Sequence, residues 1–322
     1  MNSSFSYQFP AIRGVQAKRE YYVSMCPLRL IPKIFLFDED ELTPEMRAQR
    51  TLNKTRVPEI ARYVLDNRED YVFSAITASI DGEVEFTPNE QGSDDNLGIL
   101  RVPMDARFII NDGQHRRAAI EMALRESPDL ADESVSVVFF LDVGLERCQQ
   151  MFADLNRHAI RPSKSIGVLY DHREEQAKLA RLVVLRSPLF RDVVEMERNT
   201  LSLRSRKLFT LSAVYSATSA LLDNGDTPID LSDWADVAVD FWESVAQHFP
   251  HWQQVREGKL PAGELRKNYI HTHGIVLQAI GRVGNTLLRD YPDTWKHQLS
   301  PLQEIDWRRS NSRLWEGRAL IG

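Results

Sequence analysis

The spacing of apolar positions changes along the chain. Up to about residue 150, short apolar runs with strand composition alternate with stretches of helical spacing. The strand-like runs are 19–28, 31–37, 71–80, 106–112 and 134–143, and the helical stretches are 43–67 and a segment that starts near His115. Residues 81–100 are rich in turn-forming residues, which predicts a hairpin or a loop. This alternation predicts a sheet flanked by helices.

From about Ser165 onward, helical periodicity dominates. It is clearest in 173–185, 211–222, 230–249 and 272–288. The pattern therefore predicts an α/β (α+β) protein. We expect an α/β head over residues 1–164 and an α-helical domain over 165–322 that packs closely on the head.

Composition narrows the class of protein. A chain of 322 residues with 43% hydrophobic and 27% charged residues is typical of a soluble globular protein. No apolar run reaches the roughly 18 residues of a membrane span, and the first residues lack a signal-peptide pattern, so we expect a cytoplasmic protein that does not bind a membrane. Cys26 and Cys148 lack disulfide-framework or zinc spacing, and we expect both to be buried thiols.

The net charge of −6 is unevenly distributed. Between residues 155 and 210, twelve Lys or Arg stand against six Asp or Glu, so a basic region lies within an acidic chain. Such asymmetry is expected of a phosphate-binding face. Charged residues on solvated helices produce similar counts, and they are the alternative explanation.

Residues 109–124, IINDGQHRRAAIEMAL, place a polar cluster between a strand and a helix. Gly113 permits a tight turn with positive φ, and helical residues are expected from Gln114 onward. The unused N–H groups and the positive dipole end of such a helix form an anion site, to which Arg116 and Arg117 add charge. A phosphate would fit in this turn.

Two other roles for this turn remain open. Asp112 and His115 are close enough across a tight turn to serve as an acid and base pair. The simpler alternative is that Asp112 caps the helix while the arginines pair with nearby carboxylates.

A second polar cluster lies in 151–165, MFADLNRHAIRPSKS. The cluster contains a carboxylate, an amide, a guanidinium and an imidazole, from Asp154, Asn156, Arg157 and His158. Two further basic residues, Arg161 and Lys164, follow in the sequence. Amide, imidazole and guanidinium groups can grip phosphate oxygens and orient a base or a ribose. The alternative is that Asp154 caps a helix while Arg157 is solvated.

Further basic residues are candidates for contacts with a DNA backbone. They are Arg47, Arg50, Lys54 and Arg56, several of which share a face if the segment is helical, and Arg204, Arg206 and Lys207. Residues 306–318 also mix Arg with Ser, Asn and Trp, although their tryptophans suit packing. The histidine pairs 248/251 and 271/273 lack a carboxylate or cysteine at metal-ligand spacing, so no metal site is predicted.

NDGQHRRAAI (111–120) resembles the signature of the DGQHR-domain family. With FADLNRHAIRPSKS (152–165) and the basic, helical second half, the chain is similar over essentially its whole length to the DndB family, regulators of bacterial DNA phosphorothioate modification gene clusters. The resemblance implies a mixed-sheet head related to the ParB and sulfiredoxin type of fold, in which an arginine-bearing strand-to-helix turn binds nucleotide phosphates. The motif maps onto Asp112, Gly113, Gln114, His115 and Arg116, and its second element onto Asp154, Asn156 and His158.

The hypothesis that we favour from this resemblance is a repressor that binds double-stranded DNA at the promoter of its own dnd cluster. No cofactor is required, and dimerisation would present the basic face twice to palindromic DNA. No typical helix-turn-helix is recognisable, so the base-reading element is not predicted. Bound nucleoside triphosphate would change DNA affinity in a composite version of this hypothesis.

The alternative is an enzyme that hydrolyses a nucleoside triphosphate or nicks DNA with the DGQHR turn. Asp112 would orient water or a metal, His115 would act as acid or base, and Arg116 would stabilise phosphate charge. A hydrolase is expected to gather several carboxylates around its metal, yet only Asp112 and Asp154 lie within recognisable motifs. The regulator is therefore preferred.

Overall fold

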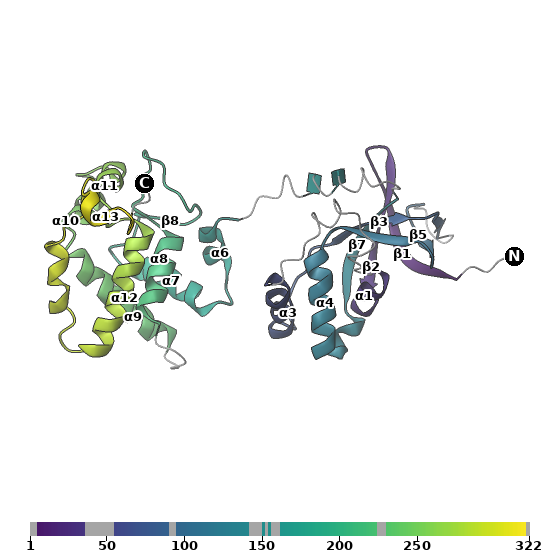
Figure 1. Ribbon diagram of the computed structural model, residues 1–322, viewed down its shortest axis with the longest axis horizontal. Helices are drawn as coiled ribbons and strands as arrows, with labels where there is room; N and C mark the ends of the chain where they lie inside the picture. Colours follow the sequence, from purple (N-terminus) through teal and green to yellow (C-terminus); the bar gives the residue numbers. More distant parts are fainter. Residues whose placement is uncertain are drawn as a thin grey trace. The chain divides into compact units, whose positions relative to one another are not determined.

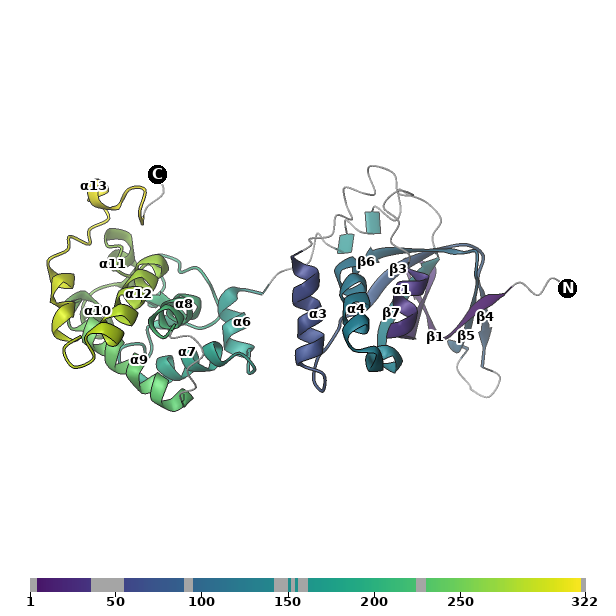
Figure 2. The same ribbon diagram turned by 60° about the horizontal axis from the view of Figure 1, so that its bottom comes forward.

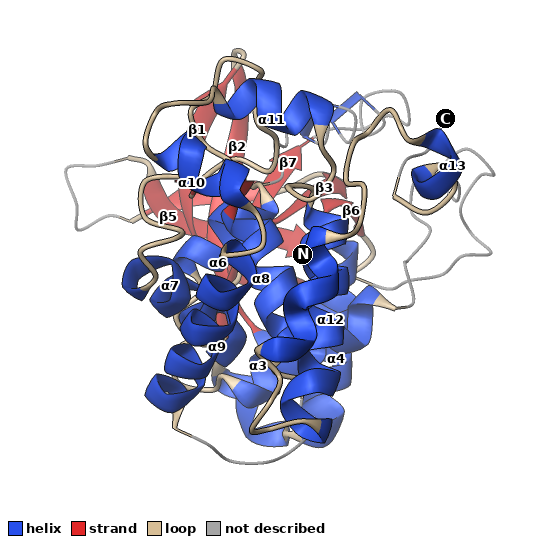
Figure 3. Ribbon diagram, turned by 90° about the vertical axis from the view of Figure 1, so that its left-hand side faces the viewer, coloured by secondary structure: helices blue, strands red, loops and turns tan. Residues whose placement is uncertain are grey.

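A computed structural model describes residues 5–35, 55–89, 95–141, 150–151, 154–155, 162–223 and 230–319. The chain divides into two units, Met1–Ala159 and Ile160–Gly322. The first, the sheet unit, contains a seven-stranded sheet, and the second, the helical unit, is mostly helical (Figures 1 and 3). Each unit has a hydrophobic core of its own. The α/β head and helical second half predicted from the periodicity are thus confirmed as a mixed α/β chain.

The sheet unit is built on one mixed sheet with the strand order β4-β5-β1-β2-β7-β3-β6. Neighbouring strands are antiparallel except β3 and β7, which run parallel, with Ile76 opposite Val137. The order places β6 at one edge. The strands are β1 Ser6–Gln16, β2 Arg19–Pro27, β3 Ile76–Asp81, β4 Glu85–Pro88, β5 Leu97–Pro103, β6 Arg107–Asp112 and β7 Ser134–Leu141.

Helices pack against this sheet through alternate residues of its strands. Val137 and Phe139 of β7 are fully buried and share one core with Ile120. Helix α4 lies between α1 and α3, as Figure 2 shows. The helices of the sheet unit are η1 Leu28–Leu30, α1 Ile31–Ile34, α3 Arg56–Asp66, α4 Gln114–Glu126 and η2 Pro128–Asp132.

Most strands of the sheet unit follow the predicted pattern, with two exceptions. The prediction of a strand over 31–37 is wrong for Ile31–Ile34, which is helical. Pro32 suits the first turn of a helix, and Ile31 and Ile34 are both buried at a spacing of three residues. Strand β1 was not predicted because Pro10, which lacks an N–H, interrupts its pattern. The hairpin expected within 81–100 is confirmed by the antiparallel pair of β4 and β5.

The helical unit contains the helices predicted from the apolar spacing of the second half, which are confirmed as α7, α8, α9 and α12. A short parallel pair, β8 and β9, lies between α7 and α8 in the sequence. The elements are α6 Lys164–Tyr170, α7 Glu175–Arg186, β8 Val194–Glu195, β9 Phe209–Thr210, α8 Leu211–Leu221, α9 Leu231–Ala246, α10 Pro250–Arg256, α11 Ala262–Asn268, α12 Gly274–Asp290, η3 His297–Gln303 and α13 Ser312–Trp315.

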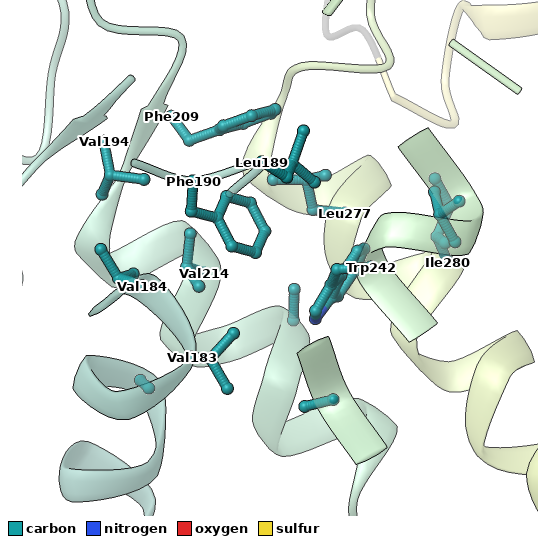
Figure 4. Packing of buried hydrophobic residues seen from close by; sticks show 14 of the residues in the cluster. Val183, Val184, Leu189, Phe190, Val194, Phe209, Val214, Trp242, Leu277 and Ile280 are labelled. Atoms are coloured by element: carbon teal, nitrogen blue, oxygen red, sulfur yellow. The ribbon is translucent and has the colours of Figure 1, made fainter. Parts of the chain in front are cut away.

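Aromatic packing and one close helix crossing organise the helical core. Phe190 and Trp242 are buried with ring centroids 6.1 Å apart, among Val183, Val214 and Leu277 (Figure 4). Helices α8 and α12 meet where a Cβ on Gly281 would lie 2.2 Å from the carbonyl oxygen of Ala217. Only glycine permits this approach, which fixes the middle of α12 beside α8.

Candidate functional site

The DGQHR turn joins edge strand β6 to helix α4. Asp112 ends the strand opposite Thr77, where the pairing with β3 shifts register, and Gly113 follows with φ of 113°. The helix begins at Gln114. The prediction of a glycine turn with positive φ is therefore confirmed. A Cβ on Gly113 would also lie 3.1 Å from Ile76 Cγ1 and 3.2 Å from Arg116 Nη2, so the turn has little room for a side chain.

Arg116 and Asp112 form the central ion pair of the turn. Arg116 Nη2 donates to Asp112 Oδ2 at 2.6 Å and to the carbonyl oxygen of Ala75 at 3.1 Å. The Arg116 side chain is 21% exposed and that of Asp112 42%. Asp112 does not cap α4, because the N-cap is Gly113 and no side chain accepts a capping bond there. The expected cap is thus wrong, whereas the pairing of an arginine with a nearby carboxylate is confirmed.

The start of α4 offers backbone donors beside this pair. The first intrahelical bond runs from Arg117 N to Gly113 O at 2.9 Å, so the N–H groups of the preceding turn are not used within the helix. The partial positive charge of a helix of this length is concentrated at the same end. The unused N–H groups, the helix dipole and the Arg116 guanidinium therefore all favour negative charge at this end of the helix.

His115 lies in a positively charged setting. Burial lowers its pKa, the charges of Arg56 and Arg116 lower it further, and Asp112 opposes them. The imidazole is therefore neutral at neutral pH. Arg56 is the first residue of α3, which packs on α4 through Val57 and Ala119. The structure thus brings one of the predicted DNA-binding arginines, Arg56, to the DGQHR turn.

Arg117 is a structural residue, and its expected contribution to an anion site is wrong. It is 8% exposed, and it donates from Nε to Phe35 O at 2.9 Å and from Nη2 to Pro32 O at 3.2 Å. Its Nη1 pairs with Glu121 on the same helix. All three interactions direct the guanidinium into the protein, where it ties α4 to the segment around α1.

Two buried amides flank the turn with groups left unused. Asn111 is 1% exposed and donates to Ser79 Oγ at 2.8 Å, while its Oδ1 has no partner in the described part of the chain. Gln114 is 7% exposed, and its Nε2 likewise has no partner among the described residues. Buried polar groups are seldom left unsatisfied, so such amides are available to a bound molecule or to water.

The second motif is described only in part. Asp154 is exposed in a short helical stretch, and its Oδ1 accepts a hydrogen bond from Gln150 Nε2 at 2.7 Å. The other residues predicted for this motif lie outside the described residues, and so do the predicted residues of the first basic segment apart from Arg56. They are Asn156, Arg157, His158 and Arg161, and Arg47, Arg50 and Lys54.

The remaining predicted DNA-binding residues lie on the helical unit. Lys164, the first residue of α6, donates to Ser216 Oγ at 3.0 Å, and its Nζ lies 5.1 Å from the centroid of the Tyr215 ring. Lys207 Nζ donates to Asp192 O at 2.9 Å. Arg204 and Arg206 are exposed.

Other basic residues of this unit were missed by the sequence analysis. Arg266, Lys267 and Arg309 line a groove together with Lys164. Of these three, only Arg309 lies in a segment that the sequence singled out, 306–318. Their grouping depends on contacts between distant parts of the chain.

The histidines expected to be non-ligating lie around a buried aromatic cluster. His271 is 1% exposed, and its Nδ1 accepts a hydrogen bond from Trp252 Nε1 at 2.9 Å. Across the described ranges, no three His, Cys, Asp or Glu side chains converge as a metal site would require. Cys26 is buried as expected, and burial raises the pKa of its thiol to about 12, whereas Cys148 lies outside the described residues. Among the helices described, none combines the length and apolar character needed to cross a bilayer.

The sequence that forms this mixed sheet, DGQHR turn and helical unit matches a family model of proteins associated with DNA sulfur modification. The family model with this description, DndB, matches residues 9–322. The chain therefore belongs to the DndB family. No curated protein and no solved structure matches the chain.

Proposed function

We propose that this chain is a DNA-binding transcriptional repressor that acts on the promoter of its own DNA phosphorothioate-modification (dnd) gene cluster. The observation that carries the proposal is membership of a family associated with DNA sulfur modification over nearly the whole chain. A regulator of such a cluster must find one DNA region among many. It therefore needs both phosphate contacts and contacts that read sequence or shape.

Exposed basic residues of the helical unit support the DNA-binding part of this proposal. Arg204 and Arg206 lie exposed on a loop before β9, and Lys164 begins α6. These residues belong to the region in which basic residues outnumber acidic ones two to one. Phosphate contacts of this kind give affinity and strong salt dependence without base specificity. In a homodimer, the same residues would face the two halves of a palindromic operator.

The DGQHR turn fits a ligand-binding element of this regulator. The family resemblance implies a relation to the ParB and sulfiredoxin type of fold, and the glycine turn between β6 and α4, with the arginine one helical turn later, fits that relation. Unused backbone donors, the Arg116 guanidinium and the orphaned Gln114 amide suit the phosphates of a nucleoside triphosphate. Binding of such a ligand would change the affinity for DNA if the two binding events are coupled.

The enzyme hypothesis is less favoured by the geometry of the same turn. One oxygen of Asp112 is held by Arg116 at 2.6 Å, so this oxygen is not free to orient a water molecule. A neutral His115 near two cationic side chains is a weak base, since the charges of Arg56 and Arg116 lower its pKa. Both observations fit a site that binds an anion better than a site that activates water.

A fluorescence-anisotropy titration tests the proposal. The wild-type chain is titrated against the promoter of its own cluster and against a scrambled duplex of equal length, at low and moderate salt, with and without ATP. We expect tighter binding to the promoter and a steep loss of affinity with salt. Equal, weak binding to both duplexes, together with phosphate release or a nicked strand, would overturn the repressor in favour of the enzyme.

A double variant and a control that removes one exposed charge locate the phosphate contacts. The double substitution Arg204→Ala and Arg206→Ala should weaken binding to both duplexes and reduce the slope of log K against log salt by about two. Arg289→Ala is the control, because Arg289 is exposed at the end of α12 and pairs with its neighbour Asp290. This control should bind as wild type does.

A further inference from the structure

A groove on the helical unit carries positive charge without any compensating carboxylate. Its volume is about 890 Å³, and its lining includes Lys164, Arg266, Lys267 and Arg309 but no Asp or Glu. Within the described part of the chain, none of these four residues forms an ion pair. Four cations that share a groove without counter-charges repel one another, so a bound anion relieves this repulsion.

The groove is rigid on the side formed by Arg266. This guanidinium donates to the carbonyl oxygens of Leu201 at 3.0 Å, Ser202 at 2.7 Å and Ser205 at 3.1 Å. The loop that carries these carbonyls packs directly on α11, since a Cβ on Gly263 would lie 1.9 Å from Leu203 O. Arg266 therefore stabilises the loop that forms one side of the groove. Lys267 and Arg309 are exposed and remain available to a ligand.

Backbone donors converge on the same groove. Helix α12 has 17 residues and begins at Gly274, which lines the groove, and its N-cap His273 provides no side-chain cap. The first helical bonds come from Val276 and Leu277 to His273 O, both at 3.0 Å, so Gly274 and Ile275 keep unused N–H groups among the described residues. At the start of the neighbouring α8, by contrast, backbone N–H groups have side-chain acceptors. The Thr210 side chain caps this helix, and Ser165 Oγ accepts a hydrogen bond from Ser212 N.

A buried hydroxyl supplies an independent sign of a ligand. Thr272 is 6% exposed, lines the groove, and has an Oγ1 without any hydrogen-bond partner in the described chain. An unpaired buried hydroxyl is costly, and native proteins rarely keep one without a bound water, ion or ligand. Thr272 lies two residues before the open start of α12. Its unpaired hydroxyl and the unused N–H groups therefore belong to the same short stretch of the groove lining.

We propose that this groove binds a phosphate group, with the start of α12 and Thr272 donating to its oxygens and Lys267 and Arg309 neutralising its charge. The phosphate belongs either to a DNA backbone or to a nucleotide, two sources with the same oxyanion chemistry. The identification of the phosphate as part of a DNA backbone rests on the proposed function. The phosphate site itself is independent of that function, because it requires only a phosphate-bearing ligand.

The test uses two groove variants of the full chain and one control. Thr272→Val removes the hydroxyl at nearly constant shape, and the double variant Lys267→Ala and Arg309→Ala removes two exposed charges. Arg289→Ala, which removes one exposed charge at the far end of α12, is the control. Binding of the promoter duplex is followed by anisotropy, and binding of ATP and inorganic phosphate by calorimetry. The calorimetry is repeated in an Arg116→Ala background, so that the DGQHR turn does not contribute.

We expect the double variant to lose at least tenfold in affinity for one phosphate-bearing ligand, and Thr272→Val to lose about tenfold, as for one hydrogen bond. Thr272→Val should also raise the melting temperature, because it removes an unsatisfied buried group. That combination separates a ligand contact from damage to the fold. The control should retain wild-type affinity.

The source of the phosphate follows from which affinity falls. Loss of duplex binding with a shallower salt dependence identifies the DNA backbone, and loss of ATP binding alone identifies a nucleotide. Wild-type affinity of both groove variants for DNA, ATP and phosphate would overturn the proposed groove while leaving promoter recognition intact. Conversely, a wild-type chain that ignores the promoter but binds ATP through the groove would refute the repressor and support the groove.

Discussion

Arg116 and Asp112 are held together across Gly113, with Arg116 Nη2 2.6 Å from Asp112 Oδ2. The guanidinium Nε is buried and has no partner among the described residues. The ion pair therefore satisfies only part of the hydrogen-bonding capacity of the Arg116 guanidinium. An anion bound at the proposed site would compete with Asp112 for the same guanidinium, so Asp112 would lower the affinity of that site.

Removing the charge of Asp112 should strengthen anion binding at the turn. In Asp112→Asn, Arg116 is no longer neutralised, so we expect the affinity for ATP to rise about tenfold, whereas Arg116→Ala should abolish binding at this site. Calorimetry with ATP measures both effects. Asp105→Asn, which neutralises an exposed acid in the same unit, is the control. Weaker binding by Asp112→Asn would show that the carboxylate itself serves the ligand, as the enzyme hypothesis requires.

Gly113 should resist substitution for steric and conformational reasons. In Gly113→Ala, the positive φ and the close contact of the new Cβ with Ile76 both destabilise the folded state. We expect the free energy of unfolding of the sheet unit to fall by about 1 to 3 kcal/mol. Gly167→Ala is the matched control, because a Cβ there would meet nothing within 4 Å and Gly167 lies within helix α6. The control should be neutral or slightly stabilising. Urea unfolding followed by circular dichroism measures both, and equal effects would refute the argument.

Arg117 should matter for stability rather than for ligand binding. Arg117→Leu leaves the carbonyl oxygens of Phe35 and Pro32 without their donor and removes one of the two arginine partners of Glu121, the other being Arg125. We therefore expect the free energy of unfolding to fall by about 2 to 4 kcal/mol. Arg125→Leu removes a guanidinium that is 76% exposed on the same helix and should change stability by less than about 1 kcal/mol. Urea denaturation compares the two. Similar losses would show that burial of Arg117 is not decisive.

Local signals made the DGQHR turn predictable from the sequence. A glycine between an apolar strand and a helical pattern specifies a positive φ and a helix start, and both are found at Gly113 and Gln114. The Arg116 and Asp112 pair also follows from a spacing of four residues. Such features depend on neighbours along the chain, so a single sequence contains them.

Contacts between distant residues explain what the sequence did not reveal. The anchoring of Arg117 to Phe35 spans 82 residues, and the groove joins Lys164 to Arg309 through the packing of several helices. No periodicity connects such positions. The exposed face of a helix looks the same in the sequence whether it faces solvent alone or lines a groove with three other cations.

His271 predicts how the stability of the helical unit depends on pH. Burial, followed by the charges of His251 and His273, lowers the pKa of His271 to about 3. In the unfolded chain its pKa is about 6.5, so below pH 6.5 the unfolded state binds a proton that the folded state does not. Its contribution is therefore present above pH 6.5 and is lost as the pH falls toward 3. The expected loss is about 1.4 kcal/mol per pH unit for this one group.

Replacement of His271 should flatten this acid dependence. His271→Asn keeps an acceptor for Trp252 Nε1 but cannot gain a proton, so the free energy of unfolding should fall less steeply between pH 6.5 and 5 by about one proton. All six tryptophans lie in the helical unit, so tryptophan fluorescence in urea isolates this unit from the sheet unit. The exposed His172→Asn is the control and should leave the slope unchanged. Identical slopes for wild type and His271→Asn would mean that other groups, such as the partly buried His273, govern the acid sensitivity.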